Sequence, residues 1–240
     1  MNLKKKLLAA ASAFIIILSF SGCDVLFPTF MDFDVSGYIS ALLDSSYREN
    51  HEMYITYTME TLDSAQENNM TTVENAAVNF CNTYEIYPSE EQMIEIEELM
   101  KELYTKANYS VKDEVKVSGG YAVKIEIQPL LNLQSCASKF GTLKADIESG
   151  THTMKSNSSG AEGNSGTTSV NGTNAAASLD TNELYIKEVI YACKEAAADL
   201  GEYGSVIAVT MDIKANDRGE LFLDTTQLEE IDQTVLPMTY

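Results

Sequence analysis

The sequence has no tryptophan and only two histidines among 240 residues. A histidine-based catalytic triad needs a histidine fixed in a packed site, and a zinc site needs several histidine or cysteine ligands at close spacing. His51 stands near the start of an expected helix and His152 in a polar segment, so neither fits these arrangements. We therefore expect no catalytic residue and no metal site, and we interpret the chain as a non-enzyme.

Positive charge is also scarce. The chain carries 16 Lys and Arg against 36 Asp and Glu, which gives a formal net charge of −20. Such a surface repels the phosphates of nucleic acids, and we expect no nucleic-acid partner. The acidity is typical of a soluble secreted protein, and a cationic cell-wall component also fits it.

Glycine-rich loops that cradle phosphates are missing as well. Gly119-Gly120 is better explained as a tight hairpin turn between two strands. The acidic residues between Asp212 and Gly219 have the wrong spacing for a calcium loop. The sequence therefore indicates no cofactor.

The apolar run at the N-terminus is too short to cross a membrane. Leu7–Phe20 spans about 14 residues, whereas a membrane helix needs roughly 20. Three lysines precede this run, and Ser21-Gly22-Cys23 follows it. This pattern is typical of a lipoprotein signal peptide, and no A-x-A site supports the alternative of an ordinary secretory leader with an incidental cysteine.

The leader predicts the location of the mature protein. Residues 1–22 would be removed as the signal peptide, and Cys23 would carry the lipid, with acyl chains such as palmitate. Two chains on one residue anchor a protein stably. We expect residues 23–33 to form a membrane-proximal stalk and the folded part to lie outside the cell, on the outer face of the cytoplasmic membrane.

Three cysteines remain after Cys23, and an odd number cannot all pair within one chain. Cys81, Cys136 and Cys193 each fall on the apolar side of an expected helix. Buried thiols are the default interpretation, and one disulfide stays open because an extracellular location is oxidising.

The segment 34–148 is predicted to hold several helices followed by a hairpin. Apolar spacing indicates a helix from Val35, capped by Asp34 or Ser36, and a second over 51–67. Thr71-x-x-Glu74 and Ser89-x-x-Gln92 match capping boxes and predict two more helix starts. Strands are expected at 109–117 and 121–127, and a weaker helix over 133–147, as judged from the apolar positions Leu133, Cys136, Phe140, Leu143 and Ile147.

The segment 149–180 consists almost entirely of Ser, Gly, Thr, Asn and Ala. It cannot bury enough apolar surface to offset the entropy of ordering, and we expect a disordered linker. After it, residues 181–240 repeat the earlier plan with a helix, strands at 207–213 and 221–223, and a last helix capped by Thr226.

A single hairpin is not stable alone, so the two hairpins are expected to pair edge to edge. The predicted fold class is α+β: several N-terminal helices and a four-stranded antiparallel sheet formed by two hairpins, with helices packed on one face. The linker is then an insertion within one domain. Two separate subdomains are the alternative.

The residues also resemble a known group of proteins. Asp34-Val-Ser-Gly-Tyr38, Ala107-Asn-Tyr-Ser-Val111 and Gly120–Pro129 are similar to segments of Gram-positive lipoproteins that carry a domain of unknown function, as is the tail Tyr185–Leu236. The resemblance covers most of the chain except the linker. It implies a small α+β domain, of a cystatin-like or NTF2-like kind, and it implies no activity or site residue.

Tyrosine is the abundant aromatic residue, with 13 copies. Many of these tyrosines fall on or beside apolar stripes, where core packing with the hydroxyl at the rim is the default. A ligand pocket between helices and sheet is the alternative. The candidate pocket or core residues are Tyr38, Tyr47, Tyr57, Tyr109 and Tyr121.

Three function classes follow from these observations. The first is a non-catalytic binding or structural module whose partner is an extracellular protein, a wall component or a small ligand. The alternatives are a lipid-anchored solute-binding protein of a transporter and a carboxylate-based cell-envelope hydrolase. A two-lobed structure would favour the former, and a buried Asp/Glu pair in a cleft would favour the latter.

Overall fold

The computed structural model describes residues 33–152, 181–199, 201–215 and 221–238. The expected signal peptide, Cys23, the stalk up to residue 32 and the linker from residue 153 lie outside the described residues. The elements are α1 (Val35–Arg48), α2 (Glu52–Thr58), α3 (Leu62–Thr83), α4 (Glu90–Thr105), β1 (Asn108–Val111), β2 (Val115–Val117), β3 (Gly120–Gln128), α5 (Asn132–Ala137), α6 (Phe140–Glu148), α7 (Thr181–Ala198), β4 (Ile207–Ala215), β5 (Leu221–Phe222) and α8 (Thr225–Val235).

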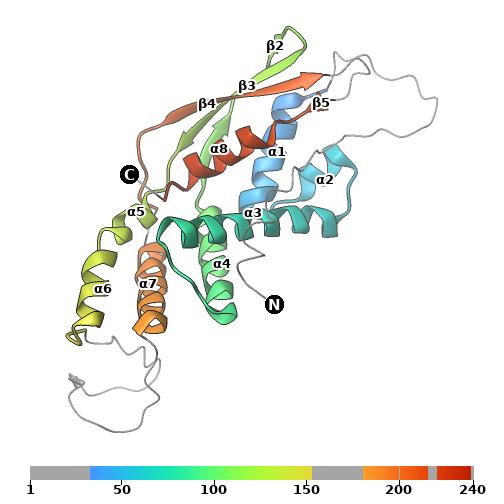
Figure 1. Cartoon of the computed structure of the whole chain (residues 1–240). Coiled ribbons are helices and arrows are strands. Elements are labelled where there is room, and N and C mark those ends of the chain that lie inside the picture. Colours follow the sequence, from blue (N-terminus) through green and yellow to red (C-terminus); the bar gives the residue numbers. More distant parts are fainter. Residues whose placement is uncertain (1–32, 153–180, 200, 216–220, 239–240) are drawn as a thin grey trace.

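One antiparallel sheet contains strands from both sides of the linker (Figure 1). Its order is β1-β3-β4-β5, and β2 pairs with β3 beyond the end of β1. The junction is the β3–β4 pair, in which Tyr121 lies opposite Ile213 and Ile127 opposite Ile207. The predicted α+β class and the sheet formed by two hairpins are therefore confirmed, with the first predicted strand divided into β1 and β2.

The turn between β2 and β3 depends on glycine at two adjacent positions. Gly119 has a φ of 81°, in the left-handed region that favours glycine. A Cβ on Gly120 would collide with the carbonyl oxygen of Ile213 on β4. The Gly119-Gly120 pair thus forms the turn and also lets β3 approach β4 closely.

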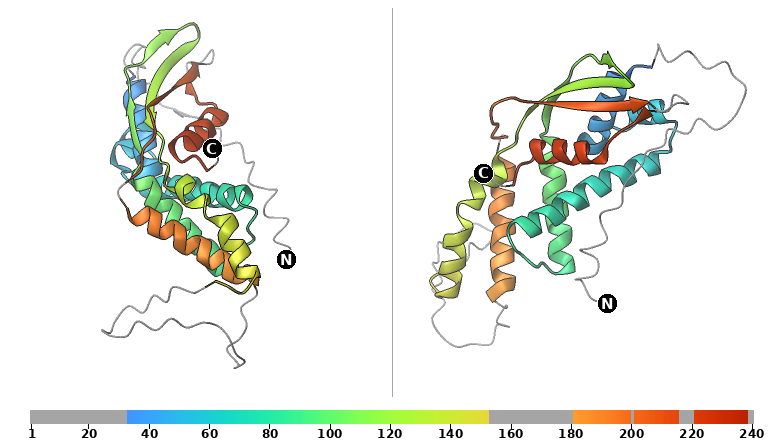
Figure 2. Two further views of the ribbon diagram at one scale, coloured as in Figure 1. Left: turned by 90° about the vertical axis from the view of Figure 1, so that its left-hand side faces the viewer. Right: turned by 45° about the horizontal axis from the view of Figure 1, so that its top comes forward.

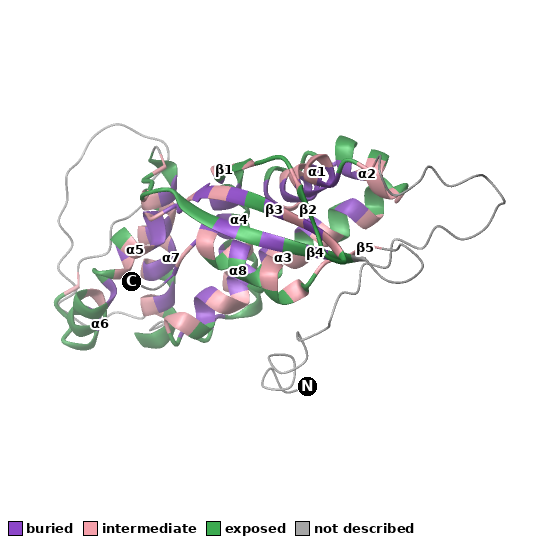
Figure 3. Ribbon diagram, turned by 90° about the horizontal axis from the view of Figure 1, so that it is seen from above, coloured by how far each residue is buried: buried purple, intermediate pink, exposed green. Residues whose placement is uncertain are grey.

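Only one face of the sheet is buried. Buried positions alternate with exposed ones along β4 and mostly with partly buried ones along β3 (Figure 3), because successive side chains of a strand point to opposite faces. Helices α1 and α8 contact the buried face. That face is filled by Val123, Ile125, Ile127, Val209, Met211 and Ile213.

Helix starts agree with the sequence in some places and not in others. Asp34 caps α1, and the Ser89–Gln92 capping box opens α4. The second and third predicted helices are divided differently, because α2 ends at Thr58 and α3 runs unbroken from Leu62 through Thr71. The predicted cap Thr226 is also wrong, since Asp224 accepts the backbone N–H of Thr226 and caps α8.

Helices α5, α6 and α7 form an arm beside α4 that runs away from the sheet (Figure 2). The single helix predicted over 133–147 is two helices, with a break at Ser138 and Lys139. Leu133, Cys136 and Phe140 are nonetheless buried as the apolar spacing predicts. No helix in the described part of the chain is both long and apolar enough to cross a bilayer.

Candidate functional site

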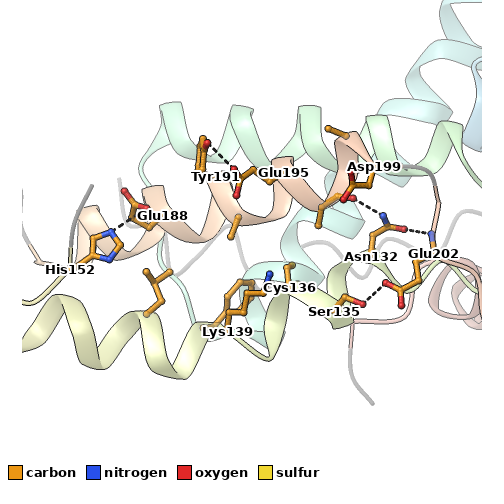
Figure 4. A pocket seen from close by; sticks show the side chains of 15 residues that line it. Asn132, Ser135, Cys136, Lys139, His152, Glu188, Tyr191, Glu195, Asp199 and Glu202 are labelled. Atoms are coloured by element: carbon orange, nitrogen blue, oxygen red, sulfur yellow. Dashed lines mark hydrogen bonds and ion pairs between the residues drawn. The ribbon is translucent and has the colours of Figure 1, made fainter. Parts of the chain in front are cut away.

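A groove of about 820 Å³ lies in this arm, between α5 and α6 on one side and α7 on the other (Figure 4). It continues past the C-terminal end of α7 to Glu202. Its lining residues are Asn132, Ser135, Cys136, Lys139, Phe140, Leu143, His152, Glu188, Tyr191, Ala192, Glu195, Ala196, Ala198, Asp199 and Glu202.

Buried Asn132 fixes one end of the groove by joining its two sides. Its side-chain amide donates to the carbonyl oxygen of Ala196 on α7 at 2.7 Å, and its Oδ1 accepts the backbone N–H of Glu202 at 3.0 Å. Ser135, three residues later, donates its hydroxyl to the Glu202 carboxylate at 2.5 Å. These bonds hold α5 against the C-terminal end of α7.

The floor of the groove is apolar, and a pair of thiols lies at and beneath it, with Cys136 lining the groove. The Sγ atoms of Cys136 on α5 and Cys193 on α7 lie 3.0 Å apart, and both residues are buried. The hydrogen bond from Cys193 holds the pKa of Cys136 below its ordinary value, with a smaller contribution from Lys139. The same bond, together with burial, raises the pKa of Cys193.

Carboxylates outnumber cations around the rim of the groove. Glu188, Glu195, Asp199 and Glu202 face a single lysine, Lys139, together with His152. The Nε2 atom of His152 lies 3.3 Å from a Glu188 oxygen. Tyr191 donates to Glu195 at 3.0 Å, and this bond raises the pKa of Tyr191. An acidic rim over an apolar floor suits a ligand that combines positive charge with aliphatic groups.

None of the five candidate tyrosines lines this groove. Tyr38 and Tyr57 lie together near the start of α1, where Phe33 packs against both rings. Tyr57 donates its hydroxyl to Asp34 at 2.8 Å, and the Tyr38 hydroxyl is buried. Burial raises the pKa of this Tyr38 hydroxyl.

Tyr47 and Tyr109 form a second aromatic group with Tyr104, on the inner side of β1. The rings of Tyr47 and Tyr104 stack with centroids 4.9 Å apart, and Tyr109 meets Tyr47 edge to face. Two of these rings have acidic partners: Tyr47 donates to Asp232 at 2.6 Å, and Tyr109 donates to Asp44 at 2.5 Å. Tyr121 is separately buried on β3.

His51 lies at the start of a helix, as the sequence predicts. It occupies the N-cap position of α2 without making a side-chain capping bond. Its ring is buried, and Nδ1 lies 2.9 Å from the hydroxyl oxygen of Ser45 on α1. His51 therefore joins α1 to the start of α2.

The sequence matches no protein-family model and no curated protein. Among solved structures, the fold is similar to the crystal structure of "a putative lipoprotein (ycdA)" from Bacillus subtilis, with a TM-score of 0.54 and 16% sequence identity. The likeness covers 85% of this chain and 56% of that one, so this chain spans little more than half the length of that structure. At this identity the likeness shows the fold alone.

The groove itself is what reasoning from the sequence missed. The apolar stripe through Cys136 and the stripe through Cys193 are both visible in the sequence. Their pairing is not visible, because 57 positions separate the two cysteines and the linker lies between them. The acidic residues of α7 that line the groove carry no motif that would distinguish them from an ordinary solvated helix face.

Proposed function

We propose that this protein is a lipoprotein, anchored through Cys23 to the outer face of the cytoplasmic membrane, and that it acts there as a non-catalytic binding module. The anchor is supported by the leader that ends at Ser21-Gly22-Cys23. The likeness in fold to a Bacillus subtilis chain described as a lipoprotein adds to this support.

Membership of the group of uncharacterised Gram-positive lipoproteins is part of this proposal. The shared fold supports it, although no family model matches. A cystatin-like or NTF2-like relationship stays a proposal that rests on the layout alone, with helices packed on one face of an antiparallel sheet.

A non-catalytic role is favoured by how the sheet is packed. The inner face, where a pocket between helices and sheet would open, is filled by aliphatic side chains of β3 and β4. The alternative of a two-lobed solute-binding protein draws no support from a chain whose two halves share one sheet. The partly buried carboxyl of Asp232 accepts a hydrogen bond from Tyr47.

The binding surface in this proposal is the groove of the helical arm. The observation that carries it is the combination of an apolar floor with four carboxylates around the rim. Such a site favours a ligand with several ammonium or guanidinium groups, such as a lysine-containing peptide of the cell envelope.

A tetralysine peptide, titrated into the purified full chain by calorimetry, tests the groove. The Glu188→Gln/Glu195→Gln double variant is expected to bind roughly fivefold more weakly, because each partly exposed ion pair contributes up to about 1 kcal/mol. The matched control is Glu91→Gln/Glu98→Gln, which removes the same charge from exposed positions on α4. Equal weakening by both double variants would mean diffuse attraction to an acidic surface and would refute a groove site.

The anchor is tested by a Cys23→Ala variant, with detergent phase partitioning as the measurement. The parent is expected in the detergent phase and the variant, which cannot receive the lipid, in the aqueous phase. A Cys81→Ala variant should partition like the parent. If Cys23→Ala stayed in the detergent phase as firmly as the parent, the lipid anchor would be wrong.

A further inference from the structure

Two of the three cysteines other than Cys23 meet across the helical arm. Cys136 lies on α5 and Cys193 on α7, and their Sγ atoms are 3.0 Å apart. A disulfide bond is about 2.05 Å long, so the sulfurs need to move about 1 Å closer to form one. Cys81 lies elsewhere, on α3, where burial raises the pKa of its thiol to about 11.

The packing around the two sulfurs keeps them together. Asn132, one helical turn before Cys136, is bonded to Ala196, three residues after Cys193. Phe140, one turn after Cys136, is buried against the edge of the Tyr84 ring. The Asn132–Ala196 bond therefore holds α5 against α7 on one side of the thiol pair, and the Phe140–Tyr84 contact fixes the start of α6 on the other.

We propose that Cys136 and Cys193 form an intramolecular disulfide in the exported protein, and that Cys81 remains the free thiol. This inference rests on the proposed export, because disulfides persist in oxidising compartments outside the cytoplasm. It also resolves the odd cysteine count, since lipidation occupies Cys23 and the bridge occupies two of the other three.

The reaction is thiol–disulfide exchange with an oxidised dithiol of the exterior, either a small disulfide or a disulfide oxidoreductase. Cys136 lines the groove and its pKa is held low, so its thiolate attacks one sulfur of the oxidant and expels the other as a thiolate. Cys193, after losing its proton to solvent, then attacks Sγ of Cys136 and expels the second oxidant thiolate. The two protein thiols lose two electrons and two protons, and the oxidant disulfide becomes two thiols.

The bond would change the groove as well as the chain. It ties α5 to α7 beneath the floor, between the Asn132–Ala196 bond and the Phe140 ring. The width of the groove at its centre is then set covalently, and reduction would release it.

Alkylation of the full chain, isolated from its membrane under an acid quench, tests the proposal. The protein is denatured without reductant, treated with N-ethylmaleimide and weighed by mass spectrometry. A lipidated and bridged chain gains one adduct, on Cys81, and tryptic peptides 125–139 and 188–194 are recovered as one linked species. A lipidated chain that gains three adducts, two of them on Cys136 and Cys193, would overturn the disulfide.

The number of adducts also separates this proposal from the anchor. A chain that keeps Cys23 without lipid gains one more adduct, whether or not the bridge is present, and peptide mapping assigns it to Cys23. A bridged chain with an alkylated Cys23 thus refutes the anchor and keeps the disulfide. A Cys81→Ala variant is the matched control, because it should lose its single adduct and keep the linked peptides.

Single-cysteine variants treated with oxidised glutathione identify the attacking thiol. Cys193→Ala leaves Cys136 open to the groove and near Lys139, whereas Cys193 does not line the groove. The Cys193→Ala variant should therefore form the mixed disulfide roughly tenfold faster than Cys136→Ala forms one at Cys193. Equal rates, or a faster reaction at Cys193, would refute the assigned order of attack.

Discussion

Asp232 is the residue whose environment departs furthest from that of a solvated carboxylate. It lies on α8, part of its surface is still accessible, and no ion pair to a cation is found for it in the described part of the chain. Burial raises the pKa of its carboxyl to about 7. The hydrogen bond donated by Tyr47 lowers this pKa in part, whereas the nearby charge of Glu229 raises it further. The group is therefore close to half-ionised at neutral pH.

The free energy of unfolding should consequently fall as pH rises toward neutrality. Below the ordinary pKa of 3.8 the carboxyl is protonated in both states, and between 3.8 and about 7 the folded state keeps a proton that the unfolded state has lost. Above pH 7 the full cost of burying the charge applies, at most roughly 4 kcal/mol for a shift of this size.

Asp232→Asn should remove that dependence. The amide oxygen still accepts the Tyr47 hydroxyl but carries no charge, so we expect the variant to be more stable than the parent by about 2–4 kcal/mol at pH 8 and nearly equal at pH 4. Urea unfolding at both pH values is the measurement. Asp146→Asn, at an exposed position on α6, serves as the control. A variant less stable than the parent at pH 8 would contradict the raised pKa.

The residues of α8 show which buried positions the sequence predicts and which it does not. The stripe Leu228, Ile231 and Val235 predicts the buried side of α8, and Ile231 and Val235 are indeed buried. Asp232 sits beside this stripe, and nothing local indicates that it turns inward. Its partner Tyr47 lies 185 positions away, so the contact exists only once the sheet has brought α1 and α8 together.

At the scale of elements, α3 shows how a local signal can mislead. Thr71-x-x-Glu74 has the form of a capping box, yet Thr71 lies inside the helix and its hydroxyl donates to the carbonyl oxygen of Glu67. Tertiary contacts carry the helix through this region, since Ala65 and Asn69 are buried and Asn69 donates to the Ser46 carbonyl oxygen at 2.7 Å. The true N-cap is Thr61.

The two threonines therefore give opposite expectations on mutation to alanine. Thr61→Ala should lower the free energy of unfolding by about 1 kcal/mol, because the hydroxyl that accepts the Ser64 N–H is lost. Thr71→Ala should be neutral or stabilising by up to about 0.5 kcal/mol, since alanine has the higher helix propensity. The midpoints of urea unfolding of the two variants are the measurement. A larger loss of stability in Thr71→Ala than in Thr61→Ala would support a helix start at Thr71, as the sequence suggests.

The helical arm likewise contains features that the sequence predicts and features that depend on tertiary contacts. Its two apolar stripes are evident from residue spacing, and so each helix face is predictable. The break between α5 and α6 and the docking of both on α7 are not, because they depend on side chains on either side of the linker. The candidate groove arises from this docking, and the sequence contains its components without their arrangement.

At the scale of the whole molecule, the pairing of the two hairpins is the inference that the sequence supports best. An isolated hairpin leaves its apolar face and edges uncovered, so joining β3 to β4 is the simplest way to bury both. The structure confirms this pairing over Tyr121–Ile127 and Ile207–Ile213.

The proposed disulfide also acts at this scale, since it would join two positions 57 residues apart across the linker. Closing a loop of that length stabilises the folded state by roughly 4 kcal/mol in the chain-entropy account. The bridge would then hold α5 and α7 together across the linker.

The net negative charge and the proposed lipid anchor are both properties of the whole molecule. In the proposed mature form, loss of the three leader lysines would make an acidic chain more acidic, and the lipid on Cys23 would hold it beside the membrane. Under this proposal, the lipid on Cys23 sets where the groove would meet its ligand.

Mass spectrometry of the N-terminal peptide from the membrane-bound mature protein tests this account most directly. We predict that the chain begins at Cys23, that its sulfur carries a diacylglyceryl group, and that residues 1–22 are gone. A Cys23→Ala variant should retain its leader. A mature N-terminus at any other residue, or an unmodified Cys23, would contradict the account.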